Sequence, residues 1–500
     1  MNKRFFSMLL LACASIMAFA QIERPKLVVG IIIDQMRWDA LYYYYDQYGD
    51  GGFKRLLNDG FSCENHMINY IPTITAVGHA SVYTGTSPAF HGIAGNDFTL
   101  DGKMVYCCND KTVKGVGTES KAGQMSPRNM LGTTIGDQIR MASDFKARVY
   151  GVALKDRASI LPAGHSANAA FWYDSSVGHF ITSTYYMDKL PEWMVKFNKE
   201  NKTKPGVDMK MKPEGATLTF KMAEAVLKNE NLGRNTETDL PDMLCVSISS
   251  TDAMGHTYGT RGEEMKSVYM ATDEGLAHFF KTLDEQVGRG NYLVFLTADH
   301  AGAHNPNFLR RNKVAAGGTD IEGVRKRVNS QLAEKFNVQG NYICAIYDQR
   351  VYLDHALIEA NHLDLETVKK EAIKRLQEEK DFVYVVDFDA VEIASIPKLI
   401  KERIINGYRP GRSGDICAIL RPDYLGYTFD ENYRGTTHGA WNPYDAHIPL
   451  VFMGWHIQHG STTLPTRTVD TAPTVCAMLH VQMPNACMGD AISVVADQKR

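Results

Sequence analysis

Three apolar runs in the chain have the length and composition of strands buried inside a sheet. They span residues 27–33, 243–248 and 292–296. An acidic residue follows each run: Asp34 directly, Asp252 after a short Ser-Ser-Thr segment, and Asp299 just before His300. Because ligands of open α/β sheets bind beyond the carboxyl ends of the strands, we expect these side chains to meet at one edge of a sheet.

Segments with helical spacing of apolar residues alternate with the strand-like runs. Helices are expected at 37–48, 53–58, 133–142, 216–228, 263–287, 363–379 and 469–479, with further strands at 148–154, 415–421 and 448–453. Residues 84–97 have the composition of a loop, and 160–212 look irregular and are a candidate lid. The alternation predicts an α/β fold, in which a large, mostly parallel sheet carries helices on both faces and loop or lid insertions.

The candidate site residues are spread along most of the chain, from Asp34 to a histidine at 438. Such a spread favours one large domain over two independent ones. We therefore expect a single catalytic domain over 21–500, with insertions at about 160–212 and 305–435. We find no internal repeat and no low-complexity linker.

The first twenty residues are typical of a secretory signal peptide. Lys3 and Arg4 precede an apolar stretch, and Ala18-Phe19-Ala20 matches the small-residue pattern of a cleavage site. A membrane anchor would need about 20 apolar residues, and this stretch is shorter. Lipidation at Cys13, which would give an outer-membrane lipoprotein, is the alternative, but apolar residues continue past that cysteine. We expect a periplasmic protein with no membrane span.

Composition and charge are those of an ordinary soluble globular protein. The 500 residues are 44% hydrophobic and 22% charged, with a net charge of −3. This balance indicates no nucleic acid as an obligate partner. Eight cysteines remain after cleavage, but their scattered spacing contains no CxxC pair, so a zinc site made of thiolates is not expected. We expect a monomer.

The acidic and histidine residues after the strands form a candidate metal site. The set contains only Asp and His: Asp34, Asp252, His256, Asp299, His300 and His438. Carboxylate oxygen together with imidazole nitrogen suits Zn²⁺, and also Mn²⁺ or Fe, better than Ca²⁺. Six ligands are too many for one tetrahedral zinc but suit two metal ions. Such a pair can hold both the entering and the leaving oxygen of a phosphoryl transfer.

Phosphoryl transfer at such a site also needs a nucleophile and groups that stabilise the phosphoryl oxygens. Thr75 is the candidate nucleophile because metal coordination can activate a hydroxyl. Its alternative role is helix capping, and Thr73 and Ser81 remain competitors. Arg157 can grip two oxygens as a planar fork, and Lys155 can supply a point charge. If the strand at 148–154 continues through Asp156, these two side chains point to the same side.

Asn96, which could donate its amide to a phosphoryl oxygen, belongs to a set of motifs ordered along nearly the whole mature chain. They are the strand ending at Asp34, Pro72-Thr73-Ile74-Thr75 with Gly78-His79, His91-Gly92-Ile93 with Gly95-Asn96-Asp97, Lys155-Asp156-Arg157, Leu161-Pro162-Ala163-Gly164-His165, Ser250-Thr251-Asp252 to His256, Ala298-Asp299-His300, Thr437-His438-Gly439 and Val469-Asp470-Thr471-Ala472-Pro473-Thr474. In these motifs the chain resembles the alkaline phosphatase superfamily. Within it, the chain is most similar to the secreted phosphate-irrepressible alkaline phosphatases, which are monoesterases with a threonine nucleophile.

The resemblance implies two zinc ions and assigns ligands to them. One ion would be held by Asp252, His256 and His438; the other would be held by Asp34, Asp299, His300 and the Thr75 oxygen. The resemblance also selects Thr75 as the nucleophile, which would form a phosphothreonine intermediate. It implies that Asn96, Lys155 and Arg157 contact the non-bridging phosphate oxygens.

Three functions remain to be separated. The first is a zinc phosphomonoesterase acting on small phosphate monoesters. The second is a phosphodiesterase or nucleotide pyrophosphatase, whose relatives share the metal ligands but lack the Lys-x-Arg pair. The third is a non-catalytic metal-binding protein on the same scaffold. The C/S-x-P-x-R string that sulfatases need is not found in the sequence.

Overall fold

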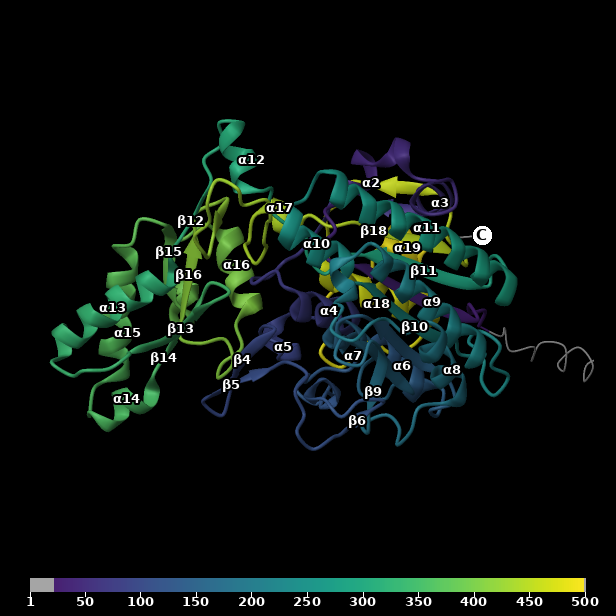
Figure 1. The fold of residues 1–500 in the computed structure, drawn as a ribbon, viewed down its shortest axis with the longest axis horizontal. Coiled ribbons are helices and arrows are strands. Elements are labelled where there is room, and N and C mark those ends of the chain that lie inside the picture. The colour runs from purple at the N-terminus through teal and green to yellow at the C-terminus, as the bar shows by residue number, and fades with distance from the viewer. Residues whose placement is uncertain (1–21, 499–500) are drawn as a thin grey trace, which may run out of the picture.

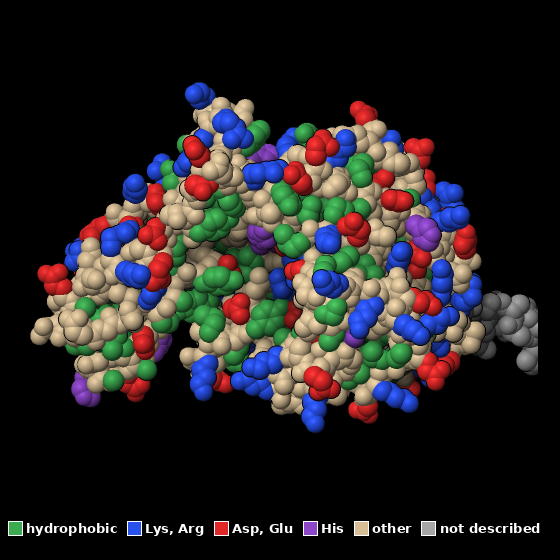
Figure 2. Space-filling view, viewed as in Figure 1, with side chains coloured by type: hydrophobic (Ala, Val, Ile, Leu, Met, Phe, Trp, Pro, Cys, Tyr) green, Lys and Arg blue, Asp and Glu red, His purple; other side chains and the backbone are tan. Residues whose placement is uncertain are grey.

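The protein has two lobes (Figure 1), and its surface is hollowed between them (Figure 2). The computed structural model describes residues 22–498, so the predicted signal peptide at 1–20 lies outside the described residues. The larger lobe is built on a ten-stranded sheet and the smaller one on a four-stranded sheet. Within the described range, none of the helices is both long enough and apolar enough to span a membrane.

The large sheet places strands from distant parts of the sequence side by side. Its strands, in spatial order, are β19 (Gly460–Thr462), β2 (Phe61–Cys63), β18 (Leu450–Gly454), β11 (Tyr292–Thr297), β1 (Leu27–Ile33), β10 (Asp242–Ile248), β7 (Val149–Ala153), β8 (Ala169–Asp174), β9 (His179–Ser183) and β6 (Gly115–Val116). The five strands from β11 to β8 run parallel to one another. β18 and β9 pair antiparallel on either side of them, so the sheet is mixed and its parallel part is the centre.

The three predicted acid-bearing strands are neighbours in this centre. β1 lies between β10 and β11, and every residue of the three strands is buried. In register, Ile33 of β1 lies opposite Ile248 of β10, and Ile32 lies opposite Thr297 of β11. The three strands therefore end at one edge, as the sequence predicted.

Helices cover both faces of the large sheet. One face packs against α9 (Glu214–Asn229), α11 (Glu263–Gln286), α2 (Ala40–Tyr43) and α3 (Phe53–Asp59). The other packs against α4 (Thr75–Thr84), α6 (Ile135–Ala142), α18 (Thr471–Leu479) and α19 (Ser493–Ala496). Alternate residues of β1 belong to the two cores, Leu27 to the first and Val28 to the second, because side chains alternate along a strand.

The smaller lobe has a hydrophobic core of its own. Its antiparallel sheet consists of β13 (Ile343–Tyr347), β14 (Arg350–Leu353), β16 (Ile416–Leu420) and β15 (Phe382–Asp387). The helices α13 (Ile321–Phe336), α14 (His355–Ala360) and α15 (Leu365–Gln377) pack on it. Helix α16 (Lys398–Gly407) and Trp441 join a separate cluster that includes Ile71 of the larger lobe.

Shorter elements connect these parts. They are β3 (His66–Met67), β20 (Thr466–Arg467), α5 (Pro88–His91), β4 (Asp97–Leu100), β5 (Lys103–Tyr106), α7 (Asp156–Ala163), α8 (Glu192–Glu200), α10 (Ser250–Tyr258), α12 (Pro306–Arg311), β12 (Gly317–Gly318), β17 (Tyr424–Leu425) and α17 (Pro443–Ala446), with five 3₁₀ turns at Tyr45–Gln47, Lys121–Gly123, Met209–Met211, Phe388–Ile393 and Thr468–Asp470.

Three local predictions were wrong. The helix expected over 37–48 is only the short α2 and a 3₁₀ turn, because Tyr44 and Tyr48 turn into the core while Tyr42 and Tyr43 stay exposed. The loop at 84–97 contains α5. Residues 160–212 are not an irregular lid, because their aromatic run forms β8, which is buried along its whole length in the large sheet.

Candidate active site

The carboxyl ends of the central strands bring three carboxylates together. Asp34 follows β1, Asp299 follows β11, and Asp252 lies in the first turn of α10 after β10. Asp34 and Asp299 are fully buried, and Asp252 is almost so. The Asp34 amide donates to the Ile248 carbonyl at 3.0 Å, which continues the β1–β10 pairing up to the site.

Three histidines face these carboxylates through their Nε2 atoms. In each, Nδ1–H can donate to a backbone carbonyl: His300 to Ala301 at 2.9 Å, His438 to Thr73 at 2.7 Å and His256 to Thr436 at 3.0 Å. A carbonyl can only accept, so each contact fixes the ring and leaves the Nε2 lone pair free for a ligand. This is the usual arrangement of histidines that bind metal.

The distances divide the six side chains into two groups that share Asp252. His256 Nε2 and His438 Nε2 lie 3.2 and 3.5 Å from Asp252 Oδ1. His300 Nε2 lies 3.4 Å from Asp34 Oδ1 and 3.5 Å from Asp299 Oδ2. Ligand atoms of Asp252, His256 and His438 fall within 4.8 Å of one another, as do those of Asp34, Asp252 and His300.

The charge balance of the cluster calls for cations. Burial and the neighbouring Asp252 and Asp299 raise the pKa of Asp34 well above its usual range. Asp34 Oδ1 and Asp299 Oδ2 are buried without a hydrogen-bond partner. Three buried carboxylates with one ammonium beside them are costly unless further positive charge is bound. The donor set therefore fits divalent metal ions.

Thr75 is the first residue of α4 and points at this cluster. Its Oγ1 lies 3.5 Å from both His300 Nε2 and Lys155 Nζ. It does not cap the helix, since Ile74 occupies the N-cap position without a side-chain bond. The two competing hydroxyls are engaged elsewhere: Thr73 donates to the Ala440 carbonyl at 2.8 Å, and Ser81 pairs with His91 at 2.9 Å.

Lys155 lies between two of the carboxylates. Its Nζ donates to Asp34 Oδ2 and to Asp252 Oδ2, both at 2.6 Å. Burial lowers the pKa of Lys155, but Asp252 and Asp34 outweigh it and the net shift is upward. The side chain is therefore a fixed cation and not a base.

The strand expected to continue through Asp156 ends earlier, at Ala153. Lys155 is instead the N-cap of α7, and Arg157 lies in the first turn of that helix. The alternation of side chains along a strand was therefore the wrong reason for placing Lys155 and Arg157 on the same side. They are neighbours because a helix begins between them, directly after a parallel strand.

Arg157 and Asn96 are positioned to offer donors. Arg157 Nη1 donates to the Tyr106 hydroxyl at 3.1 Å, while its Nε is buried with no partner. Asn96 Oδ1 accepts a hydrogen bond at 3.1 Å from the backbone amide of Ala76, the residue after Thr75. The NH₂ group of Asn96 therefore remains as a donor. An unpartnered guanidinium nitrogen and an amide donor suit the oxygens of a phosphoryl group.

Two positioning residues were missed by the sequence reasoning. Gln35 Nε2 donates to Asp252 Oδ1 at 2.8 Å, and its backbone amide donates to Asp299 Oδ1 at 3.2 Å. His79 Nδ1 lies 3.2 Å from Asp299 Oδ2 and 2.9 Å from the Thr75 carbonyl. His79 was visible only as part of a motif, and Gln35 only as the residue after Asp34.

The smaller lobe contributes the turn between β13 and β14, where Asp348 and Gln349 both have positive φ. Arg350, which is 2% exposed, donates to the Ala94 carbonyl at 2.6 Å. Gln349 donates to the Gly439 carbonyl at 2.7 Å, next to His438. The turn therefore contacts both the loop that carries Asn96 and the loop that carries His438. The partners Arg350 and Ala94 are more than 250 residues apart in the sequence, and nothing local in the sequence indicates either contact.

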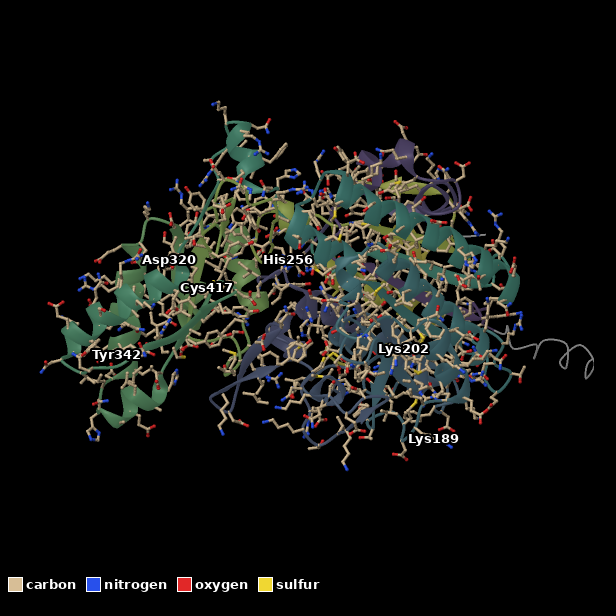
Figure 3. All side chains as sticks on the ribbon, viewed as in Figure 1. Lys189, Lys202, His256, Asp320, Tyr342 and Cys417 are labelled. Atoms are coloured by element: carbon tan, nitrogen blue, oxygen red, sulfur yellow. The ribbon has the colours of Figure 1, made fainter. Side chains whose placement is uncertain are left out.

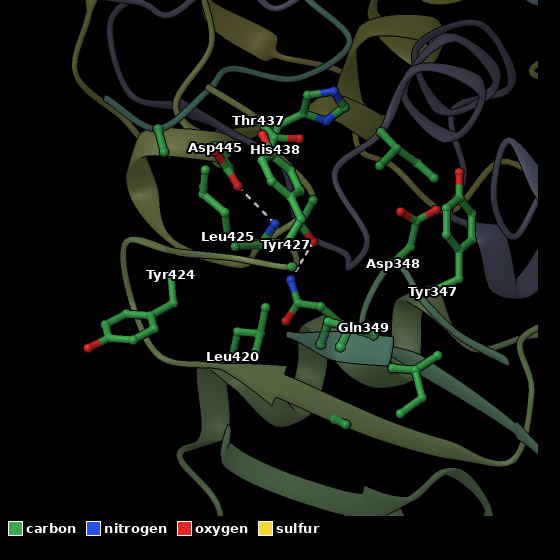
Figure 4. A pocket seen from close by; sticks show the side chains of 18 of the residues that line it. Tyr347, Asp348, Gln349, Leu420, Tyr424, Leu425, Tyr427, Thr437, His438 and Asp445 are labelled. Atoms are coloured by element: carbon green, nitrogen blue, oxygen red, sulfur yellow. Dashed lines mark hydrogen bonds between the residues drawn. The ribbon is translucent and has the colours of Figure 1, made fainter. Parts of the chain in front are cut away.

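A cavity of about 340 Å³ opens from the site between the lobes (Figure 4). Asn96, His256 and His438 form its inner end. Figure 3 shows His256 at the boundary between the lobes, with Asp320 and Tyr342 further out in the smaller one. The outer walls come largely from residues 321–349 and 418–427. The site thus communicates with a space that both lobes enclose.

Comparison with known proteins places this geometry among phosphate-ester enzymes. Residues 28–443 match the family described as type I phosphodiesterase / nucleotide pyrophosphatase. The chain is 42% identical to a Myroides odoratus protein named calcium-transporting ATPase, covering 97% of both chains. It is also 42% identical to alkaline phosphatase PafA of Elizabethkingia meningoseptica, covering 95% of both, and 41% identical to alkaline phosphatase PhoV of Synechococcus elongatus, covering 94% and 93%.

Solved structures show the same relationship. The crystal structure of wild-type PafA superposes with a TM-score of 0.89 at 41% identity, covering 95% of this chain and 99% of that one. Human ectonucleotide pyrophosphatase/phosphodiesterase 5 gives a TM-score of 0.58 at 14% identity, covering 95% and 99%, and shows a shared fold only.

Proposed function

The chain belongs to the type I phosphodiesterase / nucleotide pyrophosphatase family, and from this premise we propose that it is an alkaline phosphatase hydrolysing phosphate monoesters. Two relatives that are 41–42% identical over almost the whole chain carry the name alkaline phosphatase. The predicted membership of the alkaline phosphatase superfamily is confirmed by these relatives and by the fold.

The observation that carries the choice of monoesters is the position of Lys155, which lies 3.5 Å from Thr75 Oγ1 and is the N-cap of α7, with Arg157 in the first turn of the same helix. A phosphate monoester dianion presents one more charged oxygen than a diester. Two fixed cations beside the nucleophile stabilise that extra charge, and a diester gains less from them.

We propose that the site holds two zinc ions. Asp252, His256 and His438 would hold one, and Asp34, Asp299, His300 and the Thr75 oxygen the other. Bound zinc would lower the pKa of a coordinated hydroxyl and stabilise negative charge on oxygen. Three imidazole nitrogens in the set disfavour Ca²⁺, which prefers oxygen ligands, so the site chemistry does not support the calcium transport named for one relative.

The residues of the chain then have distinct roles in a two-step displacement. Thr75 Oγ1 loses its proton and attacks phosphorus; its bond to phosphorus forms, the bond to the alcohol oxygen breaks, and the departing alcohol oxygen takes up a proton. Asn96, Lys155 and Arg157 hold the non-bridging oxygens throughout. Water then attacks phosphorus, breaks the phosphothreonine bond, and returns the proton to Thr75 while inorganic phosphate leaves.

The test compares an aryl phosphate with a bis-aryl phosphate. The wild-type protein is expected to prefer the monoester, and Arg157→Ala to lower kcat/KM for the monoester about 100-fold or more while affecting the diester far less. Thr75→Ala should abolish turnover of both while the zinc content, measured by metal analysis, stays at the wild-type level.

Two results would contradict the proposal. Wild-type-like hydrolysis by Thr75→Ala would remove the threonine from the mechanism. A preference for the diester would instead assign the protein to the phosphodiesterases, the second candidate, which the family description favours. Zinc at full stoichiometry with no turnover of either ester would favour a non-catalytic metal-binding protein.

We further propose that the enzyme acts in the periplasm as a monomer on small phosphate monoesters, without a nucleic acid partner. The charged start, apolar stretch and cleavage-site pattern of residues 1–20 support export.

A further inference from the structure

We propose that the cavity beside the site binds the alcohol part of the ester and selects uncharged or cationic alcohols that carry an apolar or aromatic group. Alcohols that carry further negative charge would be disfavoured. This inference rests on the proposed phosphomonoesterase function and names the class of ester that the site would take.

The position of the cavity assigns it to the leaving group. In an in-line displacement the alcohol departs on the side opposite to the attacking oxygen. Thr75 is 1% exposed and is not among the lining residues, whereas His256 and His438 are. Asn96, a proposed phosphate contact, lies at the same inner end. A phosphoryl group between Thr75 and these residues would direct its ester oxygen into the cavity.

The walls of the cavity are mainly apolar and aromatic. Figure 4 shows Leu420 and Tyr424 on one side, with Tyr347 and Asp348 across from them, and Figure 2 shows hydrophobic side chains along the hollow between the lobes. The apolar and aromatic lining residues are Ile74, Ile321, Ile346, Tyr347, Phe382, Leu420, Tyr424, Leu425, Tyr427 and Tyr444. Such walls favour an alcohol with an apolar or aromatic body.

The charged groups on the walls are acidic. Asp348, Asp423 and Asp445 line the cavity, and its lining contains no lysine or arginine. Asp445 Oδ2 accepts the Ala440 amide at 2.8 Å, its Oδ1 is buried without a hydrogen-bond partner, and the Asp423 amide donates to the Tyr444 hydroxyl at 2.8 Å. Asp348 pairs with Arg350 at 3.3 Å, but Arg350 lies behind it: the Asp348 side chain is 17% exposed and that of Arg350 is 2% exposed.

This arrangement discriminates by charge. An anionic substituent entering the cavity would lose hydration, find no cation to pair with, and face the Asp348 carboxylate. An ammonium group would instead face a carboxylate and the rings of several tyrosines, which attract cations over their faces. Neutral groups would be intermediate, since they lose little hydration and gain the apolar contacts.

The test uses three benzyl phosphates with different para substituents: cationic trimethylammoniomethyl, its uncharged isostere neopentyl, and the smaller, anionic carboxymethyl. Because the substituents are remote, the pKa of the leaving alcohol is nearly constant across the series. We expect kcat/KM to be at least about tenfold higher for the cationic ester than for the anionic one. The neutral ester should fall between them.

Variants distinguish the effect of a charge inside the cavity from the effect of the same charge elsewhere on the lobe. Asp348→Asn should reduce the cation-to-anion ratio several-fold, and any loss that acts through its partner Arg350 should affect the three esters alike and cancel in the ratio. Glu359→Gln, an exposed acid on α14 of the same lobe, removes the same charge and should leave the ratio at the wild-type value. Tyr427→Ala should lower kcat/KM for the cationic and neutral esters together.

The outcomes are distinguishable. Equal kcat/KM for the three esters, or a ratio that Asp348→Asn does not change, would overturn the inference while leaving the phosphomonoesterase intact. Absence of turnover with all three, and also with phenyl phosphate, would instead refute the proposed function, and the inference would fall with it.

Discussion

At the scale of single residues, Gln35 shows how the carboxylates of the site are held in position. Its φ of 63° is unusual for a residue other than glycine, and such strain persists only where the surroundings impose it. The side chain bonds Asp252 and the backbone amide bonds Asp299, so one residue orients a carboxylate of each proposed zinc site.

Replacement of Gln35 tests this role. Gln35→Ala removes the bond to Asp252 and is expected to weaken zinc binding and kcat/KM by about 10- to 100-fold, the usual cost of losing a partner of a metal ligand. Gln35→Gly also relieves the positive φ and keeps the amide bond to Asp299. Zinc affinity, measured by competition with a chelator, should fall in both variants, but the glycine variant should unfold at a higher urea concentration than the alanine variant. Unchanged zinc affinity would contradict the role.

The residues that sequence reasoning found share a simple signal. Asp34, Asp252 and Asp299 follow strand-like runs, and parallel strands bring their ends to one edge whatever lies between them. Gln35 and Arg350 carry no such signal, because their partners are fixed by backbone geometry and by packing between distant segments. The proposal of Thr75 as nucleophile, in preference to Thr73 and Ser81, likewise needs coordinates or a family resemblance to support it, since all three hydroxyls precede or occupy the same helix.

At the scale of elements, the turn between β13 and β14 connects the smaller lobe to the loops that carry the proposed site residues Asn96 and His438. Arg350 contacts the segment that carries Asn96 from behind. A side chain on Gly95 would collide with the Arg350 guanidinium, since a Cβ there would lie 2.4 Å from its Nη2. The guanidinium and the loop are therefore packed in direct contact.

We expect Arg350→Met to lower kcat/KM for an aryl phosphate about 10- to 100-fold, because Asn96 loses its fixed position. If Arg350 acts through Asn96, then Asn96→Ala and Arg350→Met combined should cost little more than Asn96→Ala alone. Zinc content should be unchanged. Arg327→Met, on the exposed face of α13, is the matched control and should retain wild-type activity. Fully additive losses would show that Arg350 does not act through Asn96.

Most regular elements were predictable because their pattern is long and periodic; α9, α11, α15 and α18 are examples. Prediction failed where the pattern was short or where tertiary contacts determined the local structure. The segment 160–212 looked irregular because a polar turn separates β8 from β9. Residues 155–157 looked extended because the strand before them gives no sign of its end. The division into one domain with insertions at about 160–212 and 305–435 stays a prediction.

At the scale of the whole molecule, buried neutral histidines make stability depend on pH. His91 accepts the Ile93 amide at its Nδ1, so its Nε2–H donates to Ser81 and the ring is neutral. Burial, together with Arg412, lowers the pKa of His91 to about 3, and burial with His447 does the same for His66. In the unfolded chain both rings titrate near 6.5.

The sign of the effect follows from the proton count. Between pH 6.5 and about 3 the unfolded chain binds protons that the folded chain does not, so stability falls as the pH falls. Each ring should contribute up to about 1.4 kcal/mol per pH unit to the free energy of unfolding. Urea unfolding between pH 7.5 and 5, in excess chelator, measures this slope. His91→Gln should reduce the slope, and His459→Gln, on the surface, should not. A slope unchanged by His91→Gln would contradict the assignment.

The order of the proposed ligands along the chain has a consequence for synthesis. The first lies at residue 34 and the last at residue 438, after the whole smaller lobe. A polypeptide emerging from a ribosome or a translocation pore therefore lacks one imidazole of the cluster until residue 438 has appeared. Prematurely terminated products that stop short of that residue would be inert, because one of the two proposed zinc sites would lack a ligand.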